Sequence, residues 1–136
     1  MNRLRPELDW MLEDLMATVP GTRQVMVLSG DGLRMAHRGA DEEFADRLAA
    51  ACAGVQSLAA AIAQMHPDAG REVRLVVIES AGGIFFLMAA GPGAYLAALA
   101  DAGVDAGLMG QQMRDLVARL GEHLATGPRA PEPEPA

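Results

Sequence analysis

The sequence predicts an α/β (α+β) domain of three layers, α/β/α, in which helices cover both faces of one five-stranded, mostly antiparallel sheet. Three observations predict this architecture. Apolar residues recur at helical spacing in three segments, and short apolar runs joined by glycine-rich turns indicate a β-hairpin and a β-meander. Two of these runs are apolar at nearly every position, which is typical of strands covered on both faces. The predicted order is α-β-β-α-β-β-β-α.

The chain length is sufficient for one domain. Its 136 residues can build a proper core, and we expect a single domain over residues 1–125. Residues 126–136 are rich in proline interleaved with glutamate, a composition that cannot bury enough apolar surface to fold. We expect them to form an extended, disordered tail.

The chain opens with a helix and a hairpin. Apolar residues recur at helical spacing over about Arg3–Thr18, and Val19-Pro20-Gly21 supplies a stop signal. Two short apolar runs follow, Gln24–Leu28 and Leu33–His37. They flank Ser29-Gly30-Asp31-Gly32, whose glycines provide the positive φ that a tight turn requires. We predict a β-hairpin whose second strand is half exposed to water.

A long central helix is predicted next, from an N-cap at Asp41 to about His66. Its bulky residues fall at heptad-like spacing on one face, which is expected to cover an apolar surface: Phe44, Leu48, Val55, Leu58, Ile62 and Met65. A solvated opposite face would carry charges, but this one carries small, uncharged residues and is expected to meet another helix or chain: Ala49, Ala50, Ala53, Gly54, Ser57, Ala60 and Ala61. The alternative is an alanine-rich helix chosen for propensity alone. Gly54 argues against it, since glycine costs about 1 kcal/mol in a helix interior.

Three strands and a helix complete the domain. Val73–Glu79 and Gly83–Ala90 are predicted strands, and the turn Gly91-Pro92-Gly93 leads into Ala94–Ala100. That last segment is either a third strand of the meander or a short helix, and the short connection favours a strand. The final helix begins near an N-cap at Asp105, and its apolar stripe comprises Met109, Met113, Leu116, Val117, Leu120 and Leu124.

Composition excludes several functions. All eleven basic residues are arginine, so the chain has no lysine for a Walker-type phosphate loop or a Schiff base. A net charge of −7 without a basic cluster argues against binding to nucleic acid. We expect the single cysteine, Cys52, to be a buried thiol. The core is expected to be aliphatic and rich in methionine, with Trp10, Phe44, Phe85 and Phe86 as its large members.

No segment is expected to insert into a membrane. The central helix approaches spanning length, but its polar residues Gln56, Ser57 and Gln64, and its excess of Ala over Leu, argue against a bilayer environment. The N-terminus, Met1 to Leu12, alternates charged and apolar residues and lacks the long apolar region of a secretory signal. We expect a cytoplasmic protein, which partners could recruit to the inner face of the membrane.

The sequence contains no recognisable catalytic constellation. His37, His66 and His123 do not lie at metal-ligand spacing, and no cysteine pair supplements them. The segment Gly91-Pro92-Gly93 predicts a turn and not a phosphate cradle, because Pro92 removes a backbone donor. We therefore expect no enzyme activity, no cofactor and no metal.

The element order, the Gly-Asp-Gly hairpin, the alanine-rich second helix and the glycine-rich turns around Phe85 and Phe86 resemble the roadblock/dynein light chain family. The resemblance covers roughly Arg3 to Leu124 and implies a profilin/roadblock-like fold. In that family two copies pair along the edge strand that corresponds to Val73–Glu79 and along the second helix, which implies a homodimer. The residues agree independently, because Leu75 and Val77 lie in a run with no proline or central charge to block edge pairing.

The resemblance also implies a function. Bacterial members of the family are associated with small Ras-like GTPases as regulators or scaffolds, and some sets include a sensor-kinase-like protein. We therefore expect a non-catalytic homodimeric adaptor that binds a small Ras-like GTPase in bacterial signalling. Stimulation of GTP hydrolysis commonly uses an arginine supplied in trans, and several arginines near strand ends are available: Arg23, Arg34, Arg38, Arg71 and Arg74.

The alternative function is a small-molecule sensor or binding domain of similar α/β fold. That alternative requires a pocket with converging polar groups. The predicted inner faces of the strands are aliphatic instead, which favours a packed core.

Overall fold

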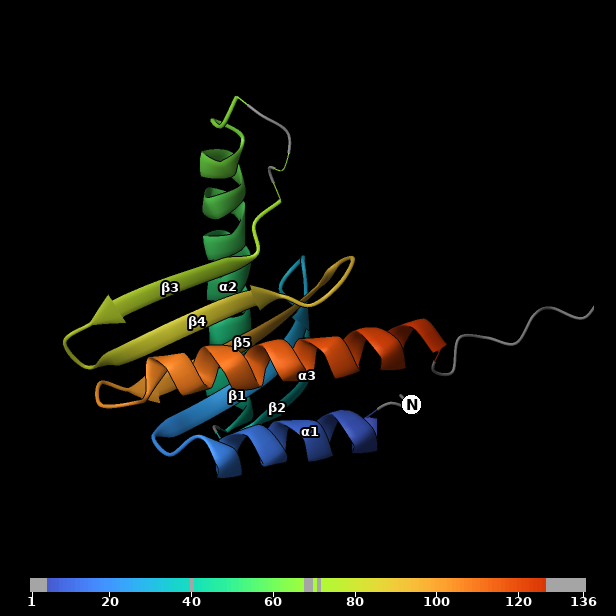
Figure 1. Cartoon of the computed structure of the whole chain (residues 1–136), viewed down its shortest axis with the longest axis vertical. Helices are drawn as coiled ribbons and strands as arrows, with labels where there is room; N and C mark the ends of the chain where they lie inside the picture. Colours follow the sequence, from blue (N-terminus) through green and yellow to red (C-terminus); the bar gives the residue numbers. More distant parts are fainter. Residues whose placement is uncertain (1–4, 40, 68–69, 71, 127–136) are drawn as a thin grey trace, which may run out of the picture.

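Three helices enclose one five-stranded sheet in the computed structural model, which describes residues 5–39, 41–67, 70 and 72–126. The predicted element order is confirmed (Figure 1). From residue 127 on, the expected tail lies outside the described residues. In chain order the elements are α1 (Arg5–Thr18), β1 (Thr22–Ser29), β2 (Arg34–Arg38), α2 (Glu42–Ala63), β3 (Leu75–Ser80), β4 (Gly83–Ala89), β5 (Ala94–Asp101) and α3 (Ala106–Thr126).

The strands are arranged in the order β2-β1-β5-β4-β3, and every neighbouring pair is antiparallel. The hairpin β1–β2 forms one side of the sheet, and the meander β3–β4–β5 forms the other. The segment that could have been a strand or a helix is the strand β5, which pairs with both β1 and β4. The two edges are therefore β2 and β3, and β3 is the edge that the family resemblance implied.

Each face of the sheet carries its own core. Helices α1 and α3 lie side by side on one face (Figure 1), and α2 crosses the other. The first core joins α1 and α3 to residues that include Val25, Val27, Phe86, Leu96 and Ala98. The second core joins α2 to the alternate residues of the same strands, among them Met26, Leu28, Phe85, Leu87 and Ala97. The central strands are apolar at nearly every position because both their faces are covered.

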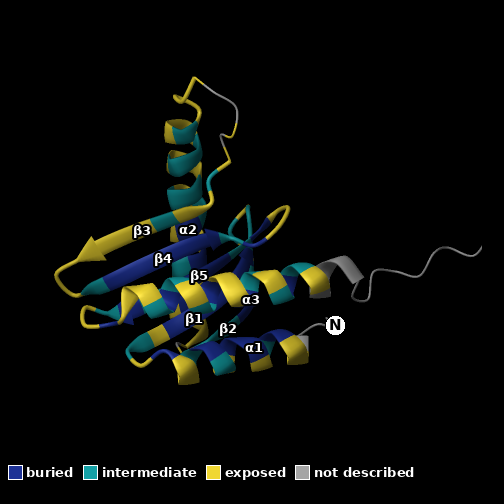
Figure 2. Cartoon of the chain, viewed as in Figure 1, coloured by how far each residue is buried: buried dark blue, intermediate teal, exposed yellow. Residues whose placement is uncertain are grey.

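Helix α2 is longer than the sheet is wide. Its 22 residues span about 33 Å, whereas five strands span about 19 Å between the outermost strand axes. The helix crosses the strands steeply and extends past β3, beyond the edge of the sheet (Figures 1 and 2). In this overhanging part Leu58, Ile62 and Met65 are 69%, 62% and 79% exposed. The residues that α2 buries against the sheet are Ala45, Ala49 and Cys52.

This arrangement corrects the predicted orientation of α2. The bulky face was expected to cover the sheet, but the residues that α2 buries fully are small, which lets the helix lie close to the strands. Of the bulky residues, Leu48 and Val55 pack against this core and stay half-buried. The apolar run of β3 was expected to be covered on both faces, yet Leu75, Val77 and Ile78 are exposed. Two predicted core residues are exposed as well, namely Trp10 at 59% and Phe44 at 39%.

Candidate interaction site

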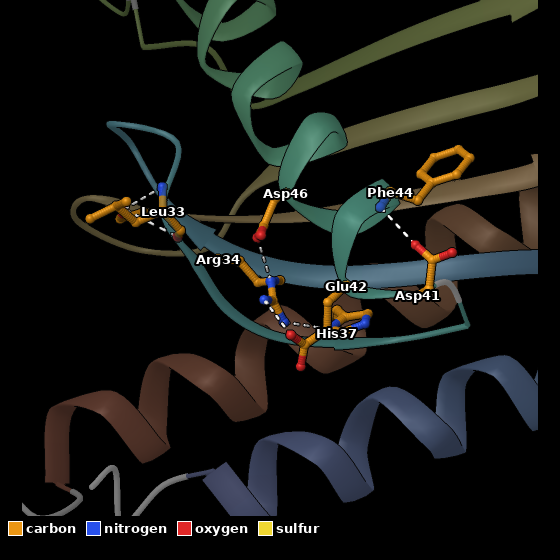
Figure 3. A network of polar contacts seen from close by, with 8 residues as sticks. Leu33, Arg34, His37, Asp41, Glu42, Phe44 and Asp46 are labelled. Atoms are coloured by element: carbon orange, nitrogen blue, oxygen red, sulfur yellow. Dashed lines mark hydrogen bonds and ion pairs between the residues drawn. The ribbon is translucent and has the colours of Figure 1, made fainter.

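The start of α2 is fixed to β2 by a network of polar contacts (Figure 3). Asp41 caps the helix, since its side chain accepts a hydrogen bond of 2.8 Å from the backbone N–H of Phe44. Arg34 of β2 donates to Asp46 at 3.0 Å, lies 4.0 Å from Glu42, and donates from Nη1 to His37 Nδ1 at 2.9 Å. Such half-exposed pairs add little stability. They do orient the helix, and they therefore set the direction in which its far end projects.

A stripe of apolar residues runs along the side of α2. Its members, which we call the heptad stripe, follow one another at alternating steps of four and three residues: Phe44, Leu48, Ala51, Val55, Leu58, Ile62 and Met65. Only Leu48 and Val55 are half-buried in the chain, and the other five are exposed. A four–three repeat of apolar residues is the pattern by which one helix packs against another. The heptad spacing noted in the sequence therefore marks a surface that is mostly open, since of its members Leu48 and Val55 pack against the second core.

Beside this stripe, the sheet presents a row of residues on the face that α2 crosses. Strand register pairs Gln24 with Leu99, Leu99 with Phe85, and Phe85 with Ile78, so the four residues stand in line across β1, β5, β4 and β3. We call them the cross-strand row. Between the row and the heptad stripe lies an apolar cavity of about 200 Å³, whose lining residues are Leu48, Ala51, Cys52, Val55, Ile78, Phe85 and Leu99.

Two further cavities continue this groove toward the ends of the strands. One, of about 310 Å³, is bounded by Arg23, Ser80, Asp101 and residues of the cross-strand row. The other, of about 380 Å³, is bounded by Arg23, Gln24, Gly39, Asp41, Phe44 and Leu99. A continuous depression therefore follows one side of α2 across the sheet.

The edge strand β3 borders this depression. It pairs with β4 on one side, and its other side faces no strand of the described chain. Leu75, Val77 and Ile78 are 42%, 50% and 45% exposed, and the strand contains no proline. Backbone N–H and C=O groups along such an edge form a template for another strand.

The predicted interface residues fall into three groups. Ala49 is 1% exposed and lies in the core beneath α2, so its expected contact with a partner is wrong. Ala53 and Ala60 are half-buried, and Ala53 packs near the β1–β2 turn, where a Cβ on Gly32 would come within 3.2 Å of it. The remaining predicted residues are exposed, four on α2 and two on β3: Ala50, Gly54, Ser57, Ala61, Leu75 and Val77.

In the part of the chain that the structure describes, these surfaces carry neither a metal-binding cluster nor a reactive thiol. Among the described residues, no group of three or more His, Cys, Asp or Glu side chains could hold a metal ion. Burial raises the pKa of the Cys52 thiol from 9.0 to about 11, which keeps it protonated and unreactive at neutral pH. None of the described helices combines the length and the hydropathy needed to cross a lipid bilayer.

Comparison with known proteins identifies the family. The model of the Roadblock/LC7 domain matches residues 8–100, from α1 to β5. The Roadblock/LC7 domain from Streptomyces avermitilis is 36% identical, with a TM-score of 0.82 over 87% of this chain and 98% of that one. MglB from Myxococcus xanthus shares the fold at 15% identity, with a TM-score of 0.80 over 88% of this chain and 96% of that one. The gliding protein MglB from Thermus thermophilus does so at 18% identity, with a TM-score of 0.79 over 90% and 94%. No functionally curated sequence is significantly similar. The chain therefore belongs to the Roadblock/LC7 domain family.

Proposed function

We propose that this protein is a homodimeric adaptor or regulator of a small Ras-like GTPase and that it performs no catalysis of its own. The observation that carries the homodimer is the symmetry of the heptad stripe. Read antiparallel about Val55, the stripe matches itself: Phe44 faces Met65, Leu48 faces Ile62, and Ala51 faces Leu58. Small Ala51 opposite large Leu58 is the size complementarity that close packing of two helices needs.

The position of the edge strand β3 agrees with a two-fold axis that passes through Val55. Val55 and Ile78 line one cavity, so the midpoint of α2 lies beside β3. An axis that pairs β3 with a second β3 would therefore also bring Val55 against its symmetry mate. The part of each α2 that overhangs its own sheet would then lie over the partner's sheet, in the groove along the cross-strand row. Both exposed apolar surfaces would be covered by one isologous contact.

The energies indicate that both contacts are needed. Burying Leu58, Ile62 and Met65, each about two-thirds exposed or more, is worth about 1–2 kcal/mol per side chain. Two copies give about 6–12 kcal/mol, against an association cost of about 4–15 kcal/mol. The heptad stripe alone is therefore marginal. Strand pairing at β3 supplies the remaining stabilisation.

The surface that we assign to the GTPase is the side of α2 turned away from the sheet. Ala50, Gly54, Ser57 and Ala61 are exposed there, and a Cβ added to Gly54 would meet no atom within 4 Å. Small uncharged residues allow the backbone of a partner to approach closely. Membership of the Roadblock/LC7 family supports a GTPase partner. A sensor-kinase-like protein of the same system is a further expected partner.

The alternative of a small-molecule sensor is less well supported. It required converging polar groups, whereas the cavity at the centre of the groove is lined only by apolar residues and the buried Cys52. In the two outer cavities, Arg23 is already paired with Asp101, and Asp41 caps α2. A pocket of this kind suits the side chains of a protein partner better than an oriented small ligand.

Disulfide trapping tests the homodimer. In a Cys52→Ser background, Val55→Cys should form a disulfide-linked dimer under mild oxidation, because only a residue on the two-fold axis meets itself within the Cα separation of about 4.4–6.8 Å that a disulfide allows. Ser57→Cys, on the side turned away from the sheet, is the matched control and should stay unlinked. Light scattering of the unmodified protein should give twice the mass of the chain. A monomeric mass at micromolar concentration would contradict the homodimer.

Binding measurements test the GTPase. The protein is immobilised, and a small Ras-like GTPase encoded beside it is applied in its GDP form and with a non-hydrolysable GTP analogue. Ala61→Glu should abolish binding, whereas Ala118→Glu, an exposed alanine of α3, should not. Loss of binding with Ala118→Glu alone would place the GTPase on the α1/α3 layer instead.

A further inference from the structure

The pocket where the cross-strand row ends contains an unsatisfied buried polar group. Gln24 is only 4% exposed, and its Oε1 atom has no hydrogen-bond partner among the residues that the structure describes. Its pairing with Leu99 places the side chain on the α2 face, where it lines the cavity of about 380 Å³ together with Asp41 and Phe44. Buried acceptors are nearly always paired, because leaving one unpaired is costly. Among the described residues, Gln24 Oε1 therefore lacks a hydrogen-bond donor.

Arg23 stands at the mouth of the same pocket. The pairing register of β1 shifts between Thr22 and Gln24, and Arg23 lies at this irregularity. Its Nε atom is 2.7 Å from Asp101 Oδ1, and its side chain is 69% exposed. A guanidinium carries five N–H donors, so this single contact leaves others available. The mouth of the pocket can therefore bind carbonyl oxygens.

A second stripe of residues on α2 indicates which segment could fill this pocket. The residues that face the sheet also follow steps of four and three: Ala45, Ala49, Cys52, Gln56, Ala59, Ala63 and, just after the helix, His66. The first three are buried against the chain's own sheet. The last three belong to the overhanging end, which has no sheet of its own beneath it. In the antiparallel dimer, they would face the partner's sheet.

The residue numbering of the antiparallel helix pair shows where His66 of one copy would lie on the other copy. The symmetry about Val55 that pairs Phe44 with Met65 places position 66, the next residue along the chain, beside position 44. Phe44 is a wall of the pocket that holds Gln24. The end of α2 also suits this pocket electrostatically. A helix C-terminus presents partial negative charge, and the last turn of α2 contains no basic residue. The carbonyls of Ala60, Ile62 and Ala63 each accept one backbone N–H, and a carbonyl oxygen has a second lone pair that can accept another donor.

We propose that this pocket is a socket for the C-terminal turn of α2 from a second copy of the chain. In the socket, the His66 imidazole N–H of the second copy donates to Gln24 Oε1, and Arg23 donates to backbone carbonyls of the last turn. The inference rests on the proposed homodimer, and it adds a polar lock at each end of the apolar helix pair. The lock fixes the register in which two heptad stripes meet, since only one register places a donor on Gln24.

Cross-linking tests the socket directly. In the Cys52→Ser background, the chain carrying both Gln24→Cys and His66→Cys should form a disulfide that joins position 24 of one copy to position 66 of the other. Within one chain, position 24 lies beside Phe44 at the start of α2, and position 66 follows the end of that helix, which is about 33 Å long. The link can therefore form only between copies. Mass spectrometry should identify the linked peptide. Gln24→Cys combined with Ala61→Cys is the control and should give no such peptide.

A double-mutant cycle measures the contact and covers the case in which cysteine perturbs the buried position. His66→Ala should weaken the dimer about 30-fold, because one hydrogen bond is lost at each of two sockets. In the Gln24→Leu background, the same substitution should have almost no effect. A wild-type protein that is monomeric overturns the proposed homodimer. If the dimer forms but the 24–66 link is absent and the two substitutions act additively, the socket alone is wrong.

Discussion

Replacing Leu58 with glutamate should dissociate the dimer without unfolding the chain. Leu58 lies in the part of α2 that extends beyond β3 and is 69% exposed. The substitution therefore places no charge in the core of the single chain, and glutamate is a good helix former. In the dimer, however, the side chain would face Ala51 of the partner inside the helix pair. The carboxylate would lose its hydration there and gain no basic partner.

The expected effect can be estimated from the exposed fraction. Losing the burial of a side chain that is about two-thirds exposed removes about 1–2 kcal/mol, and the symmetry doubles this to about 2–4 kcal/mol. Each carboxylate in a poorly hydrated contact adds a cost of at least about 1 kcal/mol. The sum of about 4–6 kcal/mol corresponds to a loss of about 10³–10⁴-fold in dimer affinity. A dimer of nanomolar Kd would acquire a Kd of about 1–10 μM and would be largely monomeric below that concentration.

Sedimentation equilibrium across a concentration series measures this change, and circular dichroism verifies the fold. Ala61→Glu is the matched control: it introduces the same side chain one turn further along α2, on the side turned away from the sheet. It should leave the dimer intact. If Leu58→Glu remains dimeric and Ala61→Glu dissociates, the helices pair through their small residues, and the heptad stripe has been assigned the wrong role.

Three other substitutions test separate parts of the argument. Val77→Lys puts a charge on the outer edge of β3 and should weaken the dimer at least tenfold in sedimentation, while the 50% exposed position keeps the chain folded. Asp41→Ala removes the cap of α2 and should lower the free energy of unfolding by about 1 kcal/mol in urea titration. The raised pKa of Cys52 should make the free energy of unfolding fall as the pH rises. Between pH 9 and 11 the unfolded chain loses the thiol proton and the folded chain keeps it, so stability should fall by about 1.4 kcal/mol per pH unit, and Cys52→Ala should abolish that slope.

The order of the elements could be predicted because each signal is local. Glycines with φ of +87° and +74°, at Gly32 and Gly93, mark turns that few other residues could form. Alternating and continuous apolar runs distinguish β2 from β4 by how many of their faces are buried. Asp41 and Asp105 cap helices through their own side chains, at 2.8 and 3.0 Å. None of these features depends on residues far away in the chain.

The orientation of α2 could not be predicted from local signals. An apolar stripe is the same pattern whether it covers a sheet or another chain, and the sequence interpretation placed the larger side chains inside. The difference between helix length and sheet width decides whether the stripe is covered, since about 10 Å or more of α2 extends past the edge of the sheet and leaves its side chains exposed. That relation requires the crossing angle of helix and strands, which only the tertiary structure supplies. Gln24 was missed for the same reason, because a glutamine at the start of a strand carries no sign that its amide is buried.

The three faces of α2 cannot act independently. The side that contacts the sheet, the heptad stripe and the side assigned to the GTPase belong to one rigid helix, and the Arg34 network fixes where that helix starts. When two chains pair about Val55, their Gly54 residues approach the same axis, and the two outward faces join into one surface free of charge from Leu48 to Met65 in each copy. A single chain presents only half of that surface, next to exposed Leu58 and Ile62. In the proposed homodimer, pairing would therefore do more than stabilise the protein, because it would create the continuous surface that we assign to the GTPase.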